Sequence, residues 1–200
     1  MYCIVLAQQV LALGARHIVT VCYLNLSKSQ GRSKVTRRKC LPRKGLRQKD
    51  FSRDPAQWAA WSTANPGCNF GVVAFASNWL IVDTDIKDGR DAAWAARCAL
   101  FAEWGVDPQA IPHVQSARGG WHDYFMLPEG VDGATLRQPD AVKGLINIRC
   151  RGYTVAAGST FESLPYLLLS DTPPHPAPPA LVTLCTPAAR PAPSALAAQG

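Results

Sequence analysis

The stretch Asn78–Gly89, NWLIVDTDIKDG, is an apolar run that ends in two aspartates two positions apart. The apolar run indicates a β-strand, and alternate side chains of a strand point to the same face of its sheet. Asp83 and Asp85 are therefore expected on one face at the strand end, with Thr84 on the other. Two carboxylates held this close repel each other unless a cation offsets their charge. The stretch thus predicts a strand of a sheet, and it raises the question of which group offsets the two carboxylate charges at the end of that strand.

Two helices are expected near this strand. Residues 54–64, DPAQWAAWSTA, begin with Asp54, which can cap a helix, followed by a proline at the first helical position. Trp58 and Trp61 are three positions apart and share a face of that helix. Residues 91–104, DAAWAARCALFAEW, are alanine-rich with apolar side chains at helical spacing, and a glycine follows them.

The remaining apolar segments read as strands joined by turns. Three hairpins are expected: residues 65–75 with 77–85, the two halves of 112–128, and residues 144–150 with 152–159. An order of strands, helix and strands predicts an α+β fold with a mixed or antiparallel sheet and packed helices. It argues against a doubly wound parallel sheet.

Charge is distributed unevenly along the chain. The segment Lys28–Arg53 carries eleven of the twenty-one Lys and Arg residues and one acid, whereas the chain from Asp54 onward has a net charge of −4. A basic arm on a mildly acidic body suggests a polyanionic partner, although a solvated basic loop without a partner explains the charge equally well. Seven scattered cysteines without a C-x-x-C pair predict reduced thiols and a cytoplasmic protein.

The two ends of the chain differ in composition from its middle. The opening fifteen residues, MYCIVLAQQVLALGA, are apolar but short for a membrane span, so a packed helix and no membrane association are expected. Residues 171–200 contain eight prolines and eight alanines, which predicts a disordered or extended linker.

Three segments carry the residues suited to chemistry. Asp83 and Asp85 form half of a site for a hard divalent cation, or else are turn-forming aspartates with Lys87 and Arg90 as counter-charges. A second segment, SARGGWHDYF, offers Ser116, Arg118 and His122 as donors to an anion, with Gly119 and Gly120 allowing close backbone approach. That segment also reads as an ordinary glycine hairpin with a structural histidine. In the third segment, Asn147 and Arg149 share one face of a strand whose other face is apolar.

The order of these motifs resembles a known family. A DPAQWAAW helix, a P-x-x-N-x-G-V turn, a strand into D-x-D, a helix, S-x-x-G-G-x-H-x-Y-F and a strand into RGYTVAAGS follow one another along the chain. Together they resemble the bifunctional primase/polymerase N-terminal domain, a branch of the archaeo-eukaryotic primase superfamily, over roughly Lys44–Ser159. The resemblance implies a primase-like, RRM-like core in residues 44–170, preceded by a divergent helix and basic segment in residues 1–43.

The resemblance also implies roles for particular residues. The family's acidic pair ligates two divalent metals, Mg²⁺ or Mn²⁺, which assigns that role and catalysis to Asp83 and Asp85. The family's S-x-H element binds the triphosphate of the incoming nucleotide. This assigns nucleotide binding to residues 116–122, with His122 also catalytic, and to Arg149.

One position departs from the family pattern. A third acidic ligand is expected just before the family's GGYVVAP segment, and Asn147 stands there. An amide keeps one oxygen ligand but removes a negative charge, so the resemblance implies weaker metal binding and slow polymerisation.

The implied partners are a DNA template or primer and deoxy- or ribonucleotides. Arg43, Lys44, Arg47 and Lys49 are expected to contact template phosphates. The proline- and alanine-rich tail resembles a linker to a helicase module in a phage or plasmid replication protein. Two other interpretations stay open: a nucleotide or single-stranded DNA binding module without catalysis, and a metal-dependent nuclease.

Overall fold

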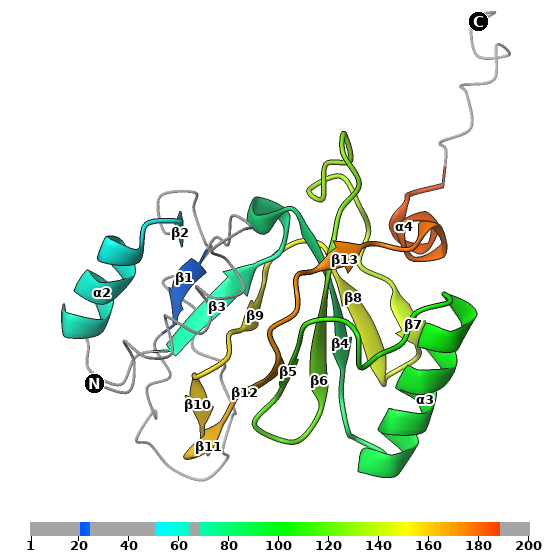
Figure 1. Cartoon of the computed structure of the whole chain (residues 1–200), viewed down its shortest axis with the longest axis horizontal. Helices are drawn as coiled ribbons and strands as arrows, with labels where there is room; N and C mark the ends of the chain where they lie inside the picture. Colours follow the sequence, from blue (N-terminus) through cyan, green and yellow to red (C-terminus); the bar gives the residue numbers. More distant parts are fainter. Residues whose placement is uncertain (1–20, 25–50, 65–68, 189–200) are drawn as a thin grey trace, which may run out of the picture.

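A computed structural model describes residues 21–24, 51–64 and 69–188 of the 200-residue chain (Figure 1). The described helices are α2 (Pro55–Ala64), the 3₁₀ turn η2 (Phe75–Ser77), α3 (Arg90–Glu103) and α4 (Pro179–Cys185). The described strands are β1 (Val21–Leu24), β2 (Phe51–Ser52), β3 (Asn69–Val73), β4 (Trp79–Thr84), β5 (His113–Gln115), β6 (Trp121–Met126), β7 (Asp140–Val142), β8 (Ile146–Arg149), β9 (Tyr153–Val155), β10 (Thr160–Phe161), β11 (Leu164–Pro165), β12 (Leu167–Ser170) and β13 (His175–Pro176).

The strands form two main sheets and a small hairpin. The larger sheet has the order β12-β5-β6-β4-β8-β7, with β13 parallel to β6, and the smaller sheet has the order β2-β1-β3-β9. Strands β10 and β11 pair with each other. Apart from β13, the described pairs are antiparallel. The predicted α+β fold with a mixed, mainly antiparallel sheet is therefore confirmed.

Two of the three expected hairpins are wrong. Residues 65–75 and 77–85 contain β3 and β4, but β3 pairs with β1 and β9, whereas β4 pairs with β6 and β8. The turn η2, followed by Asn78 with φ 58°, carries the chain from the smaller sheet into the larger one. Every residue of β3 and β4 is buried, so each strand lies inside a sheet that is covered on both faces.

The second wrong hairpin lies where the chain passes back from the larger sheet into the smaller one. Strand β8 pairs with β4 and β7, and β9 pairs with β3, so residues 144–150 and 152–159 are not a hairpin. Gly152, with φ 78°, turns the chain back into the smaller sheet. The amide of Ala74 donates to the carbonyl of Gly152 (3.1 Å), so the two segments that connect the sheets lie side by side. A turn pattern marks a change of direction in both cases, but not which strands pair.

The third hairpin and both helices are confirmed. Strands β5 and β6 pair directly, with Val114 opposite His122. Helix α2 begins after Asp54, whose carboxylate accepts a hydrogen bond from the Ala56 amide (2.9 Å), and it buries Trp58. Helix α3 covers the predicted segment and buries Ala93 and Phe101.

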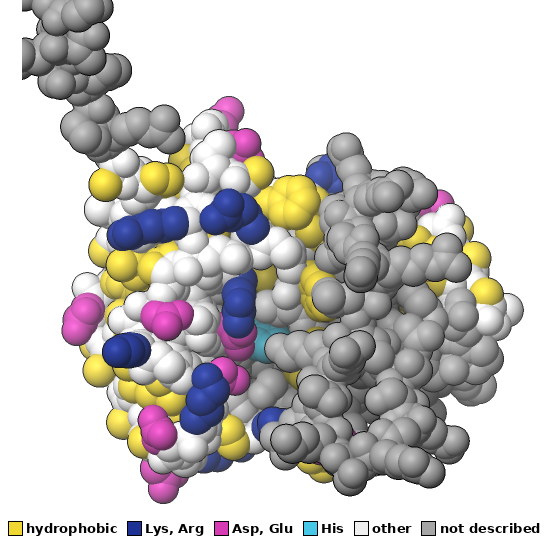
Figure 2. All heavy atoms as spheres, turned by 180° about the vertical axis from the view of Figure 1, so that it is seen from behind, with side chains coloured by type: hydrophobic (Ala, Val, Ile, Leu, Met, Phe, Trp, Pro, Cys, Tyr) yellow, Lys and Arg dark blue, Asp and Glu magenta, His cyan; other side chains and the backbone are white. Residues whose placement is uncertain are grey.

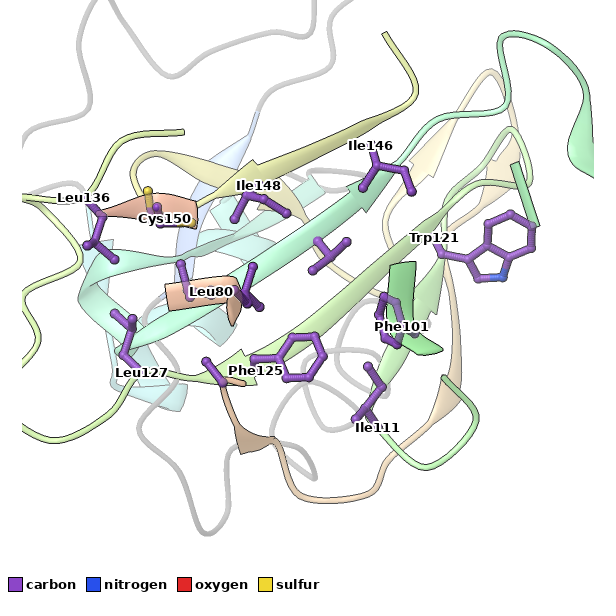
Figure 3. Packing of buried hydrophobic residues seen from close by; sticks show 14 of the residues in the cluster. Leu80, Phe101, Ile111, Trp121, Phe125, Leu127, Leu136, Ile146, Ile148 and Cys150 are labelled. Carbon is purple, nitrogen blue, oxygen red and sulfur yellow. The ribbon is translucent and has the colours of Figure 1, made fainter. Parts of the chain in front are cut away.

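The larger sheet has a different environment on each face. One face packs against α3 and α4 through an apolar cluster from the sheet and the two helices, part of which is drawn in Figure 3: Leu80, Phe101, Ile111, Trp121, Phe125, Leu127, Leu136, Ile146, Ile148 and Cys150. The other face packs partly against the smaller sheet, through a second cluster that includes Ile81, Tyr124 and Val72.

The expected linker at residues 171–200 is wrong for its first part. Residues 175–176 form β13 beside β6, and α4 buries Leu181 and Cys185. These two side chains are one helical turn apart, so a short apolar stripe is enough to anchor a proline-rich segment to the core. Residues 189–200 lie outside the described residues, as do residues 1–20 with the expected first helix. In the part of the chain that the structure describes, no helix is long and apolar enough to cross a membrane.

Candidate active site

Strand β4 runs from the core into the candidate site. Its side chains Trp79 and Ile81 belong to the cluster between the two sheets. The next side chain on the same face is that of Asp83, a buried residue, and Asp85 follows directly after the strand. This face of β4 therefore changes from apolar to acidic towards the end of the strand.

Strand register places three predicted residues in one row. Asp83 lies directly opposite His122 on β6 and directly opposite Asn147 on β8. Residues directly opposite one another in neighbouring strands point to the same face. Asn147 thus lies beside Asp83 and does not point into the core, because its neighbours Ile146 and Ile148 fill the opposite face.

Arg149 and His122 are the charged or polar partners of Asp83. The Arg149 guanidinium donates to Oδ2 of Asp83 from Nε (3.1 Å) and lies 3.0 Å from it through Nη2. Nε2 of His122 lies 3.6 Å from Oδ1 of Asp83. Arg149 is one position further along the shared face of β8 than Asn147, opposite Ile81. The predicted nucleotide-binding arginine is therefore in contact with the predicted metal ligand.

Asp85 is more exposed and has a weaker partner. Its carboxylate lies 3.4 Å from Nζ of Lys87, with side-chain exposures of 47% and 64%. Its amide donates to the carbonyl of Leu145 (2.8 Å), which fixes the backbone after β4. Arg90, the other counter-charge considered from the sequence, instead donates to Oε1 of Gln115 (3.1 Å).

The glycine turn between β5 and β6 is docked on the end of β4. A Cβ atom at Gly120 would lie 2.2 Å from the carbonyl oxygen of Thr84, so only glycine fits there. Gly119 has φ 92°, which also favours glycine. The sequence suggested that these glycines allow a ligand to approach, but the close approach in the structure is to the backbone of β4.

Ser116 and Arg118 lie on the same turn. The Gly120 amide donates to Oγ of Ser116 (3.0 Å), which leaves the hydroxyl proton of Ser116 available to another acceptor. Arg118 is exposed, and its guanidinium carbon lies 5.0 Å from the centre of the Phe161 ring. The turn thus carries a hydroxyl and a guanidinium, and it leads directly into β6, the strand of His122.

The space-filling view from behind shows part of this face. A small area of histidine surface is visible beside acidic and basic side chains (Figure 2). The side chain of Arg149 is 36% exposed and that of Asp83 is 12% exposed, so the arginine of this pair is the partner in contact with solvent.

The donor set fits one divalent cation better than two. Asp83, Asp85 and Asn147 offer oxygen atoms, which Mg²⁺ and Mn²⁺ prefer, and such ions commonly keep waters and substrate phosphates as further ligands. Within the described ranges no three His, Cys, Asp or Glu side chains are grouped as a metal site. Arg149 and Lys87 also offset the two carboxylate charges. The neutral amide of Asn147 leaves a second cation without an anionic ligand of its own.

Tyr166 is a further member of the site that the sequence analysis did not include. Its ring centre lies 5.9 Å from that of His122, and the side chain is buried. Burial chiefly raises the pKa of the Tyr166 phenol, the charge of Asp83 raises it further, and Arg118 opposes the shift. Tyr166 follows a short hairpin far along the chain from His122, and no local pattern links the two residues.

Four predicted residues cannot be placed. Arg43, Lys44, Arg47 and Lys49, expected to contact nucleic acid, lie outside the described residues.

The strand register brings together four of the predicted site residues, Asp83, His122, Asn147 and Arg149. Asp85 and the Ser116–Gly120 turn lie at the end of the β4–β6 pair.

Comparison with known proteins gives one finding. The family model described as bifunctional DNA primase/polymerase, N-terminal, matches residues 11–180. This range contains every described residue of the candidate site and extends into α4. No curated protein is similar enough to the chain to count as a match.

Proposed function

Because the chain belongs to the family of bifunctional DNA primase/polymerase N-terminal domains, we propose that it joins nucleotides on a DNA template with the help of Mg²⁺ or Mn²⁺. The observation that carries this proposal is the row His122, Asp83 and Asn147 across three adjacent strands, with the Ser116–Gly120 turn docked against the end of β4. A general DNA primase or polymerase type of function follows from the family, and we propose in addition a role for each residue of the site.

Asp83 and Asp85 hold the divalent cation in this proposal. When bound, such a cation offsets the charge of the nucleotide phosphates and of the oxygen atoms that react. The two carboxylates are well suited to this role because one is fixed by the sheet and the other is accessible to solvent. Asn147 contributes an amide oxygen on the other side of Asp83.

The basic and hydroxyl groups bind the triphosphate. His122, Arg118 and Ser116 can donate hydrogen bonds to phosphate oxygens from one side of Asp83. Arg149 approaches from the other side and can exchange its contact with Asp83 for a contact with phosphate. This exchange frees Asp83 Oδ2 when the nucleotide arrives, so nucleotide and cation are expected to bind cooperatively.

The reaction joins a 3′-hydroxyl to the α-phosphate of the nucleotide and releases pyrophosphate. Positioning and charge stabilisation supply most of the catalysis in phosphoryl and nucleotidyl transfer. A neutral Asn147 removes one anionic ligand, so we expect slow transfer relative to a site with three carboxylates. The basic residues Arg43, Lys44, Arg47 and Lys49 are proposed to bind template phosphates, which predicts affinity that falls steeply with salt.

A second function is favoured by one observation. Arg149 already occupies Oδ2 of Asp83, and Asn147 is neutral, so the site suits nucleotide binding without catalysis. A module that binds nucleotide or single-stranded DNA is therefore the alternative.

A primer-extension assay distinguishes these functions. The full chain is incubated with a labelled primer on a DNA template, deoxy- or ribonucleotides, and Mg²⁺ or Mn²⁺. Growth of the primer in the wild type and its loss in Asp83→Ala support nucleotidyl transfer. A shift in mobility without growth indicates the binding module, and shortening indicates a nuclease. Growth that persists in Asp83→Ala excludes this site as its source.

A further inference from the structure

A short hairpin beside the candidate site carries two aromatic side chains. Strands β10 and β11 pair through Thr160 with Pro165 and Phe161 with Leu164. The two residues between them, Glu162 and Ser163, have φ values of 51° and 67°, the left-handed conformation of a tight two-residue turn. Tyr166 follows the hairpin directly.

Hydrogen bonds close the base of this hairpin. The Tyr166 amide donates to the carbonyl of Ser159 (2.8 Å), and the Gly158 amide donates to the carbonyl of Tyr166 (2.7 Å). The side chain of Asn69, on β3, accepts from the Thr160 amide (2.8 Å) and donates to the Thr160 carbonyl (2.9 Å). The hairpin is therefore fixed to the smaller sheet, and its aromatic side chains have a defined position.

Each aromatic ring lies against one donor of the proposed triphosphate site. The ring of Tyr166 lies 5.9 Å from that of His122, with 33° between their planes, and Nε2 of His122 faces Asp83. The ring of Phe161 lies 5.0 Å from the guanidinium carbon of Arg118. Tilted aromatic pairs and a cation over a ring are both attractive arrangements.

From these contacts we infer that Phe161 and Tyr166 form an aromatic wall that positions Arg118 and His122 for a polyphosphate group. The inference rests on the proposed function, since it names the residues that set the affinity of the same site for the triphosphate. Neither ring needs to touch the ligand. Each holds a long or rotatable donor in place before the ligand binds, which lowers the entropy lost on binding.

The electrostatic surroundings of Tyr166 are consistent with this position. Burial chiefly raises the pKa of the phenol, the charges of Asp83 and Asp85 raise it further, and Arg118 opposes the shift.

Calorimetric titration of the full chain tests the wall with two probes in the presence of Mg²⁺. The probes are dATP and inorganic triphosphate, which share the polyphosphate and differ in base and sugar. We expect Tyr166→Leu to weaken both by the same factor, about tenfold, because a misplaced His122 loses a charge-assisted hydrogen bond. Tyr166→Phe keeps the ring and should stay within about twofold of the wild type.

Two further variants serve as controls. Leu164→Ala changes an exposed side chain of the same hairpin and should leave both affinities unchanged. Phe161→Leu should weaken both probes about threefold through Arg118, since an exposed cation and ring attract each other only modestly. This variant also tests the wall if Tyr166→Leu does not fold.

A double variant separates positioning from direct contact. If Tyr166 acts through His122, adding Tyr166→Leu to His122→Gln should cost less than about twofold beyond His122→Gln alone. Loss of dATP affinity without loss of triphosphate affinity would overturn the inference, because Tyr166 would then contact the base or sugar. Unchanged affinities in Tyr166→Leu and Phe161→Leu overturn it as well. A wild type that binds neither probe overturns the proposed function itself.

Discussion

The larger sheet carries an Arg–Asp pair on each of its faces, and the two pairs differ in almost every property except their residue types. Arg97 of α3 and Asp123 of β6 have side chains with 0% exposure, and Nε of Arg97 donates to Oδ2 of Asp123 (2.9 Å). Arg149 of β8 and Asp83 of β4 are 36% and 12% exposed. The first pair lies beneath a helix, and the second lies at the open edge of the site.

The surroundings of the two arginines explain this difference. The Arg97 guanidinium lies over the rings of Trp94, Phe101 and Trp121, at 5.0, 5.1 and 5.7 Å, and donates to the carbonyl of Pro108. Burial raises the pKa of Asp123, and Arg97 opposes this shift. Arg149 can leave Asp83 for solvent or for a ligand. An enclosed pair therefore supports the fold, whereas an exposed pair can exchange partners and so serve chemistry.

The largest expected effect follows from breaking the enclosed pair. Arg97→Met leaves the Asp123 carboxylate buried without its cation, which should destabilise the fold by about 3–5 kcal/mol. Denaturant unfolding followed by far-ultraviolet circular dichroism measures this loss. The double variant Arg97→Met with Asp123→Leu removes both charges and should recover much of it. A single variant as stable as the wild type would show that the pair does not support the fold.

A smaller effect is expected where the two faces meet. Gly120 rests on the end of β4, and Trp121 and His122 after it point to opposite faces. Because the added Cβ would clash with the backbone of Thr84, Gly120→Ala should cost about 1–3 kcal/mol. It should also weaken nucleotide binding, since the turn moves away from Asp83. Thermal unfolding and calorimetric titration measure the two effects.

Gly130 provides a control glycine outside the site. It has φ 79° and no neighbour within 4 Å of an added Cβ, so Gly130→Ala introduces backbone strain without the clash expected at Gly120. That variant should leave nucleotide binding unchanged. A nucleotide affinity in Gly120→Ala equal to that of the wild type would show that the position of this turn does not affect nucleotide binding.

The site row was predictable from the sequence, whereas the enclosed pair was not. Alternation along a strand placed Asp83 and Asp85 at one end, and the motif order linked them with His122 and Asn147. Arg97 gives no such signal, because an arginine in an alanine-rich helix normally faces solvent. Its partner Asp123 is far along the chain, and only the packing of α3 on β6 brings the two together.

The errors in strand pairing have the same origin. The segments around Ala76 and Gly152 contain ordinary turn signals, and short-range patterns favour a hairpin at each. The pairing is decided instead by distant strands, since β1 and β9 flank β3 while β6 and β8 flank β4. Composition likewise favoured a linker after Asp171, although two side chains, Leu181 and Cys185, bind α4 to the core.

The exposed pair should behave in the opposite way to the enclosed one. Arg149→Gln should change stability by less than about 1 kcal/mol, because one partner is substantially exposed to solvent. It frees Asp83 Oδ2 and removes a positive charge, so Mn²⁺ affinity should rise roughly fivefold while dATP affinity falls. Electron paramagnetic resonance of Mn²⁺ and calorimetry measure these changes. Affinities that fall together would show that Arg149 does not compete with the cation.

The smallest expected change in stability, but an informative change in activity, comes from Asn147→Asp. A carboxylate directly opposite Asp83 adds repulsion, which should lower stability by about 0.2–1 kcal/mol when no divalent ion is present. When Mn²⁺ is present, both carboxylates can bind it and their repulsion is offset. The loss of stability should then reverse, and the metal-induced rise in melting temperature should exceed that of the wild type. Primer extension should increase, because the added charge supplies the third anionic ligand.

The control is Gln138→Glu, which adds a charge at an exposed position outside the row. It should neither increase the stabilisation by Mn²⁺ nor raise primer extension. If Asn147→Asp instead loses stability equally with and without Mn²⁺, Asn147 does not face the cation.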